Sequence, residues 1–202
     1  MRKKFVTKGE AFAFEQYTVQ NPWQEEKEDR RTLKKLDDSW YRAYGISLLL
    51  GECRHDHLDL ETVVRICLVT GARWSEAKSL RKSQLAKFKI TYSNTKGSKN
   101  RTVPISKEPY ESLPGDKKGR LFSDCYGAFW SALKRTGIEL PAGHLTHVLC
   151  HTFASHFMMN GGNILVLQRV LGHTDIKMTM RYAHFAPDHL EDAVKLNPLA
   201  HT

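Results

Sequence analysis

Residues 147–184 read HVLCHTFASHFMMNGGNILVLQRVLGHTDIKMTMRYAH, and this stretch decides the fold. Thr146 can act as the N-cap of a helix over 147–159. Because residues three apart are neighbours on a helix surface, the side chains of His147 and Cys150 are expected to point the same way.

Two more helices are predicted further along the same stretch, over 163–171 and 174–183. Gly172 suits the left-handed turn that ends a helix, so His173 is expected in a loop directly after the first of them. The second helix is expected to carry Tyr182. Two imidazoles and a phenol can therefore converge.

Composition favours a basic protein that binds a polyanion. The chain has 202 residues, with 31 Lys plus Arg against 22 Asp plus Glu, a net charge of +9 and a pI near 9.4. The alternative is that the basic side chains only keep the protein soluble and bind no polyanion. No apolar run is long enough for a membrane span or a signal peptide, so we expect a cytoplasmic protein. The four cysteines form no CxxC pair, which favours free thiols over disulfides or zinc. We expect no metal and no cofactor.

The first half of the chain is interpreted as an arm followed by helices. Residues 1–36 lack apolar periodicity and are predicted to be a linker or arm. Helices are predicted over 37–52 and 59–70, the second ended by Gly71. Ser75 is expected to cap the next short helix, which puts Arg73 at a junction of two helices where its side chain can reach a cleft.

Alternating apolar residues then predict a two-stranded hairpin over 88–92 and 101–105, with a basic tip over 95–100 that includes Lys96. Pro104 suits an edge strand, because proline cannot donate to a sheet ladder. The fold class is mixed α+β, mainly helical with one small antiparallel sheet.

Two further helices complete the prediction. One is expected to be capped by Asp124 and to run to about 136, packed through Phe129, Trp130 and Leu133. The last is expected to start at Pro187 and to run to about 196.

The ordered set of motifs resembles the catalytic domain of tyrosine recombinases. It comprises Arg73 in a Gly-Ala-Arg-Trp-Ser-Glu setting, Lys96 in a hairpin, His147 at a helix start, Leu-Gly-His ending at His173, and Tyr182. More closely, the chain is similar to integrases of P-two-like temperate phages over roughly 37–198. The resemblance implies a catalytic domain over 37–202, preceded by the arm, with the usual core-site-binding domain absent.

The resemblance also implies roles for these residues. Tyr182 is the nucleophile that forms a 3′-phosphotyrosine intermediate, and Arg73 and His173 stabilise the phosphate oxygens. Lys96 is the general acid for the leaving 5′-oxygen, and His147 assists proton handling.

Cys150 departs from the family pattern. The family motif is His-x-x-Arg, whereas this chain has His147-Val148-Leu149-Cys150. A thiol lacks the charge and the fork of donors of a guanidinium. We therefore expect a chain that keeps the fold and some DNA affinity but cleaves poorly or not at all.

The implied partner is double-stranded DNA at phage and bacterial attachment sites in a bacterial host. Four protomers on two duplexes are implied, with a monomer or dimer without DNA, and with accessory DNA-bending proteins. The candidate DNA-contacting side chains are basic residues in and near the hairpin: Arg81, Lys89, Lys99 and Arg101.

Other interpretations stay open. Arg73 can pair with Glu76 one helical turn away, and Tyr182 can be an ordinary core aromatic. A non-catalytic DNA-binding protein on the same scaffold is the first alternative function. A serine hydrolase is the second, because residues 75–78 match SxxK, although Ser75 suits an N-cap and no partner motif follows.

Overall fold

The computed structural model describes residues 39–93, 100–115, 117–138, 140, 145–187, 192–196 and 199–200, with only the backbone of residues 39–44 and 56. The arm over 1–36 and the hairpin tip with Lys96 and Lys99 lie outside the described residues.

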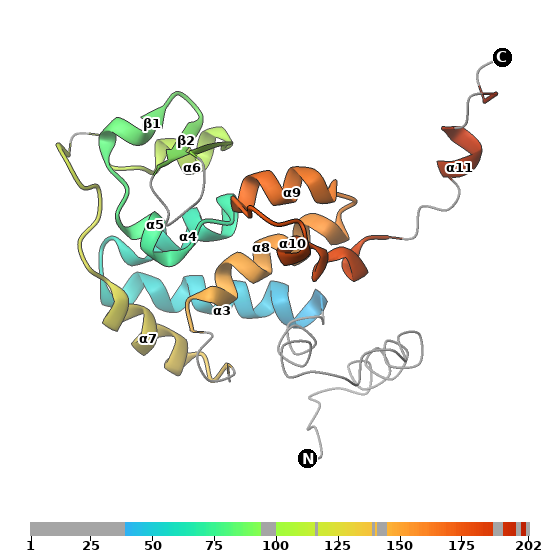
Figure 1. Cartoon of the computed structure of the whole chain (residues 1–202). Helices are drawn as coiled ribbons and strands as arrows, with labels where there is room; N and C mark the ends of the chain where they lie inside the picture. Colours follow the sequence, from blue (N-terminus) through green and yellow to red (C-terminus); the bar gives the residue numbers. More distant parts are fainter. Residues whose placement is uncertain are drawn as a thin grey trace.

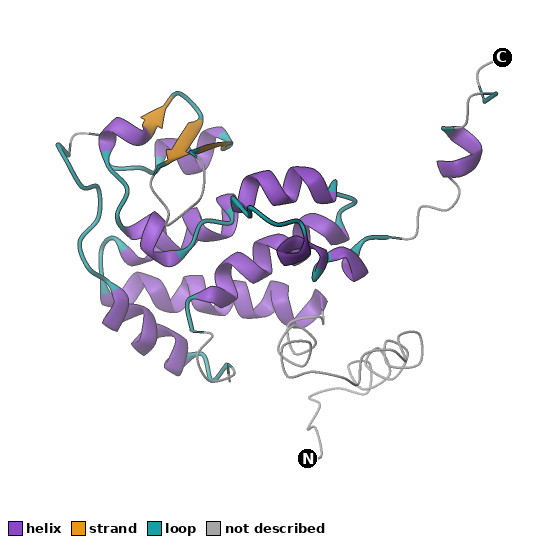
Figure 2. Cartoon of the chain, viewed as in Figure 1, coloured by secondary structure: helices purple, strands orange, loops and turns teal. Residues whose placement is uncertain are grey.

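Helices dominate the structure, and one small sheet lies at one end of it (Figures 1 and 2). The elements in chain order are α3 (Ser39–Asp56), α4 (Leu60–Thr70), α5 (Trp74–Lys78), η2 (Lys82–Gln84), β1 (Leu85–Ala86), β2 (Lys89–Tyr92), β3 (Arg101–Pro104), α6 (Lys107–Glu111), α7 (Tyr126–Arg135), α8 (His147–Met159), α9 (Ile164–Leu171), α10 (Lys177–Met180), η3 (Ala183–Phe185) and α11 (Asp192–Lys195).

Helix α4 is the centre of the main core, and it packs against α3, α5 and α8. Its buried residues lie on more than one face: Leu60, Val63, Val64, Ile66, Cys67 and Thr70. Gly71 ends the helix with φ 67°, as predicted, and donates its N–H to Cys67. A Cβ at Gly71 would lie 2.5 Å from Phe153 of α8, so the glycine also permits close approach of the two helices.

The sheet has three antiparallel strands in the order β1-β2-β3. The predicted hairpin is confirmed, since Ile90 pairs with Val103 and Tyr92 with Arg101. The sequence did not predict β1, because two residues are too short to show a period. Phe88 was expected in the strand but forms the turn between β1 and β2 with φ 59°.

Helix α7 starts at Tyr126, and its N-cap residue is Cys125 rather than the predicted Asp124. Asp124 lies before the helix and accepts the backbone N–H of Tyr126 through its carboxylate at 3.2 Å. Phe129 and Leu133 are buried as expected, but Trp130 is 49% exposed, so its predicted place in the core was wrong. Successive side chains of a helix point in different directions, and that of Trp130 lies on an exposed side of α7.

A second, smaller core lies between α8, α9 and the segment that follows α10. It contains Ala154, Met158, Leu167, Leu171 and Tyr182. The predicted class, mainly helical with a small antiparallel sheet, is confirmed. Among the described residues, no helix combines the length and apolar character needed to cross a membrane.

Candidate active site

Arg73 lies immediately before α5, with extended backbone, and is the N-cap residue of that helix. The helix starts at Trp74, so the expected cap at Ser75 was wrong; instead, the Glu76 carboxylate accepts the backbone N–H of Arg73 at 2.8 Å. The Arg73 guanidinium lies as far as 4.0 Å from the Glu76 carboxylate, and 39% of the Arg73 side chain is exposed. Capping through the backbone leaves the cationic group at the surface of the junction.

His147 and Cys150 lie in the first turn of α8, which spans the predicted residues. His147 is exposed, and its carbonyl accepts a hydrogen bond from the Cys150 thiol at 3.2 Å. Burial raises the pKa of Cys150 to about 11, although the nearby positive charge of Arg73 opposes the shift. The thiol is therefore neutral at physiological pH and lies within electrostatic range of Arg73.

His173 follows Gly172, which has φ 70° and ends α9 as predicted. The loop is held to the helix by two hydrogen bonds with Gln168: His173 donates its backbone N–H, and its carbonyl accepts the side-chain amide. The imidazole Nδ1 is 2.9 Å from the hydroxyl of Thr179. Burial, and after it the positive charges of Arg73, Arg181 and Arg101, together lower the pKa of His173 to about 4. The imidazole is neutral at pH 7.

Tyr182 lies between α10 and η3 rather than inside a helix over 174–183, so that prediction was wrong. Asp175 accepts the N–H of Lys177 and starts α10 there, and the helix has only four residues. Tyr182 is 3% exposed and forms part of the second core. Its hydroxyl is 2.5 Å from Nδ1 of His151, one residue after Cys150.

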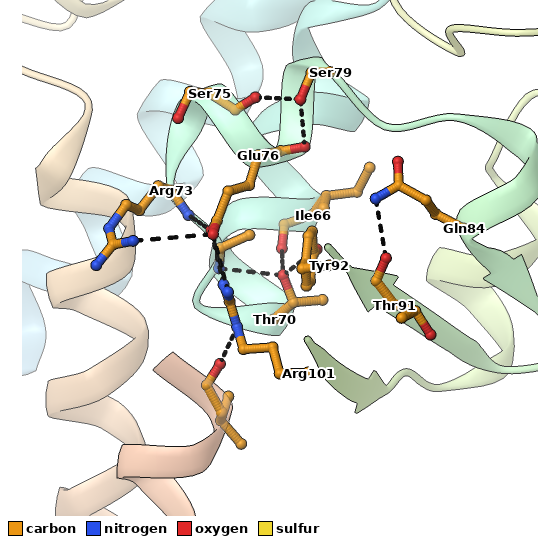
Figure 3. Close-up of polar contacts among 12 residues, drawn as sticks. Ile66, Thr70, Arg73, Ser75, Glu76, Ser79, Gln84, Thr91, Tyr92 and Arg101 are labelled. Carbon is orange, nitrogen blue, oxygen red and sulfur yellow. Dashed lines mark hydrogen bonds and ion pairs between the residues drawn. The ribbon is translucent and has the colours of Figure 1, made fainter. Parts of the chain in front are cut away.

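Arg101 does not lie where a DNA-contacting residue was expected. Its side chain is 7% exposed, and its guanidinium donates to both carboxylate oxygens of Glu76 at 2.9 and 2.7 Å. Figure 3 shows the Glu76 carboxylate between the side chains of Arg73 and Arg101. Arg101 is thus an internal ion-pair residue. Arg81 and Lys89 are exposed, which is compatible with surface contacts.

The structure brings together several of the predicted site residues. Arg73 acts electrostatically on both Cys150 and His173, although these come from three separate segments. His151 connects the same turn of α8 to Tyr182. In the described residues, no group of three or more His, Cys, Asp or Glu side chains is arranged to hold a metal ion.

Sequence reasoning missed two contributors, His151 and Glu76. His151 was detectable in principle, because it lies four residues after His147 and shares that helix face. The position of Glu76 three residues after Arg73 was visible, but its pairing with Arg101 was not, because 25 residues separate the two.

Comparison with known proteins gives consistent matches. The model of the Phage integrase family matches residues 41–189. The integrase of Escherichia phage 186 is 59% identical over 307 aligned positions, covering 100% of this chain and 91% of that protein. The integrase of Escherichia phage P2 is 46% identical over 167 residues, covering 82% of this chain; the chain spans 49% of that relative, about half its length.

A solved structure agrees with the sequence matches. The catalytic domain of bacteriophage HP1 integrase superposes with a TM-score of 0.75 and 63% identity, covering 78% of this chain and 94% of that one. These matches confirm the resemblance to integrases of P-two-like phages and the predicted fold. With most of its described residues inside the matched range, the chain belongs to the phage integrase family.

Proposed function

We propose that this chain is the catalytic domain of a site-specific DNA recombinase, which cleaves and rejoins strands through a phosphotyrosine at Tyr182. The grouping of the Arg73 guanidinium with the neutral imidazole of His173, beside the second core that holds Tyr182, is the observation that carries this proposal. A cation and a hydrogen-bonding imidazole suit the charge that develops on the phosphate oxygens.

The reaction requires two coupled proton movements. The Tyr182 oxygen attacks the phosphorus, and the phenol proton passes to Nδ1 of His151, with which it is already hydrogen-bonded. The bond from phosphorus to the 5′-oxygen breaks, and Lys96 donates a proton to that leaving oxygen. Arg73 and His173 hold the non-bridging oxygens. Attack by a 5′-hydroxyl reverses each transfer and rejoins the strand.

Assigning the phenol proton to His151 changes the role expected for His147. The imidazole in hydrogen-bond contact with the nucleophile is that of His151, whereas His147 is exposed at the start of α8. His147 then assists at the phosphate. Because Tyr182 is 3% exposed, DNA binding has to bring its hydroxyl to the surface before attack.

We also propose that Cys150 limits the rate. The neutral thiol donates to a backbone carbonyl and has no charge to offer a phosphate. Loss of one preorganised donor to a developing oxyanion typically costs about 10² to 10³ in rate. The chain is then a slow recombinase that retains DNA affinity.

The proposed partner is attachment-site DNA, bound by residues 37–202 after the arm of residues 1–36. The net charge of +9 and the exposed Arg81 and Lys89 support binding to a polyanion. The proposed reaction takes place in the bacterial cytoplasm and uses four protomers on two DNA duplexes. Without DNA the protein is a monomer or a dimer. Accessory proteins that bend DNA are further proposed partners.

The decisive experiment is detection of a covalent DNA adduct. The protein is incubated with a nicked attachment-site duplex, and denaturing gels with peptide mass spectrometry locate DNA bound at Tyr182. Tyr182→Phe is expected to abolish the adduct. Tyr126→Phe, which changes a tyrosine 47% exposed in α7, is the matched control and should retain it.

A non-catalytic DNA-binding protein is the second candidate, and the thiol at position 150 favours it. Binding that weakens steeply with salt but yields no adduct would support this candidate over a slow enzyme. The SxxK hydrolase has no such support, because no SDN or KTG partner motif follows residues 75–78 in the sequence.

A further inference from the structure

Arg101 of β3 is buried where three segments of the chain meet. Its Nη1 and Nη2 atoms donate to the two oxygens of Glu76 in α5, and its Nε donates to the carbonyl of Val170 in α9 at 2.7 Å. All three nitrogens of the guanidinium therefore have acceptors, and they connect the sheet to both helices. Figure 3 shows the fork directed at Glu76.

Two arginines compete for Glu76, and Arg101 has the shorter contacts. Its nitrogens lie 2.7 and 2.9 Å from the carboxylate, whereas the Arg73 guanidinium is 4.0 Å away. Burial alone would raise the pKa of Glu76, but the hydrogen bonds and charge of Arg101, together with the backbone N–H and charge of Arg73, outweigh burial and hold that pKa below its ordinary value. An ionised Glu76 without Arg101 would attract the Arg73 guanidinium, which already lies 4.0 Å from it.

Arg101 also supports the loop that carries His173. Val170 lies one residue before the end of α9, and Gly172 packs directly on the arginine, because a Cβ there would lie 3.1 Å from Cδ and Nη1. The guanidinium in turn lies 4.8 Å from the ring centroid of Tyr92, whose hydroxyl is 2.9 Å from that of Thr70. The loop thus rests on a side chain that the sheet and α4 fix in place.

We propose that Arg101 is a positioning residue with two effects on the phosphate site. Its positive charge balances the negative charge of the ionised Glu76 carboxylate, so that the Arg73 guanidinium stays available to DNA. It also fixes the backbone of the loop that carries His173. This proposal rests on the proposed function and deepens it. Through Arg101, strand β3 is hydrogen-bonded to the segments that carry Arg73 and His173, the residues that would hold the phosphate. Arg101 itself touches no DNA.

The test uses the DNA-free protein, so it does not depend on cleavage. Arg101→Met removes the charge and the fork, Arg101→Lys keeps only the charge, and the double variant Arg101→Met with Glu76→Gln leaves no unpaired buried carboxylate. Arg54→Met is the matched control, because Arg54 makes a two-nitrogen contact with Glu61 at an exposed site. NMR of ¹³C-labelled histidines, assigned with His173→Gln, follows the titration of His173.

A specific outcome is expected for each variant. Arg101→Met should raise the pKa of His173 towards its ordinary value, by loss of a nearby cation, and the double variant should raise it less. Arg101→Lys should leave the pKa of His173 unchanged, because the positive charge is kept. It should increase the rate of amide exchange at His173 about tenfold, because the hydrogen bond to Val170 is lost. Arg54→Met should change neither quantity.

Two results would overturn the proposal. One is a folded Arg101→Met or double variant whose His173 titrates as in the unmodified chain. The other, decisive if both of those variants fail to fold, is an Arg101→Lys protein with unchanged exchange at His173. Absence of a DNA adduct would instead count against the proposed function and leave these measurements intact.

Discussion

The hydroxyl of Tyr182 and Nδ1 of His151 are hydrogen-bonded, although 31 residues separate them in the sequence. Their rings are tilted by 43°, with centroids 5.8 Å apart. The contact joins the second core to the turn of α8 that contains Cys150. It therefore places beside the proposed nucleophile an imidazole that can accept a proton in one of its tautomers.

Replacing His151 should slow formation of the covalent intermediate. In a Cys150→Arg background, His151→Gln is expected to lower the adduct rate about 10²- to 10⁴-fold, because the phenol loses its general base. The rate is measured by quenched-flow sampling on a nicked duplex. His55→Gln, at an exposed position of α3, is the control. An unchanged rate in the His151 variant would assign the proton to another group.

Restoring a guanidinium at position 150 should increase cleavage. Cys150→Arg is expected to raise the yield of phosphotyrosyl adduct about 10²-fold or more, because a charged fork of donors replaces a neutral thiol. Cys150→Ser, which adds no charge, should give no comparable gain. The idea fails if the arginine and serine variants form adduct equally slowly.

The half-buried imidazole of His173 should make stability depend on pH. Its pKa is about 4 in the folded protein against an ordinary value of 6.5, so between these values the unfolded chain binds a proton that the folded chain does not. The contribution of the neutral imidazole to the free energy of unfolding is present above about pH 6.5 and is lost as pH falls towards about pH 4.

Urea unfolding measures this effect. Between about pH 7.5 and about pH 5 the free energy of unfolding should fall by about 1 to 2 kcal/mol through this group, after allowance for partial exposure. His173→Gln should remove that part of the dependence, while His55→Gln should retain it. Equal pH dependence in the unmodified chain and in His173→Gln would contradict the expectation.

Gly71 should be intolerant of a side chain. Its φ of 67° disfavours other residues, and an added Cβ would lie 2.5 Å from Phe153 and 2.9 Å from Leu171. Gly71→Ala is expected to lower the free energy of unfolding by at least about 1 kcal/mol. Thermal and urea unfolding measure the change.

Gly127 offers the matched control for this substitution. It lies in α7, has no positive φ, and a Cβ there would meet nothing within 4 Å. Gly127→Ala should stabilise the protein by about 0.5 to 1 kcal/mol, because alanine loses less conformational freedom in a helix. Equal effects of the two substitutions would show that neither φ nor the approach of Phe153 constrains position 71.

The sequence alone predicted the elements whose signals are local. Helix α8 spans the predicted residues, and Gly71 and Gly172 end α4 and α9 as expected. The alternation in β2 and β3 predicted their pairing. Glycine stops and apolar periods depend on residues within one or two turns of each other, so they can be read without the fold.

Only the tertiary structure decided which side chains are paired inside the protein. Arg101 has the charge expected of a DNA contact but is buried against Glu76, and His151 of α8 contacts Tyr182 of the second core. Such pairs depend on how α5, β3, α8 and α9 pack, and packing is set by many weak contacts between distant segments. The sequence determined the order and type of the reactive residues, and the packing decided which of them face one another.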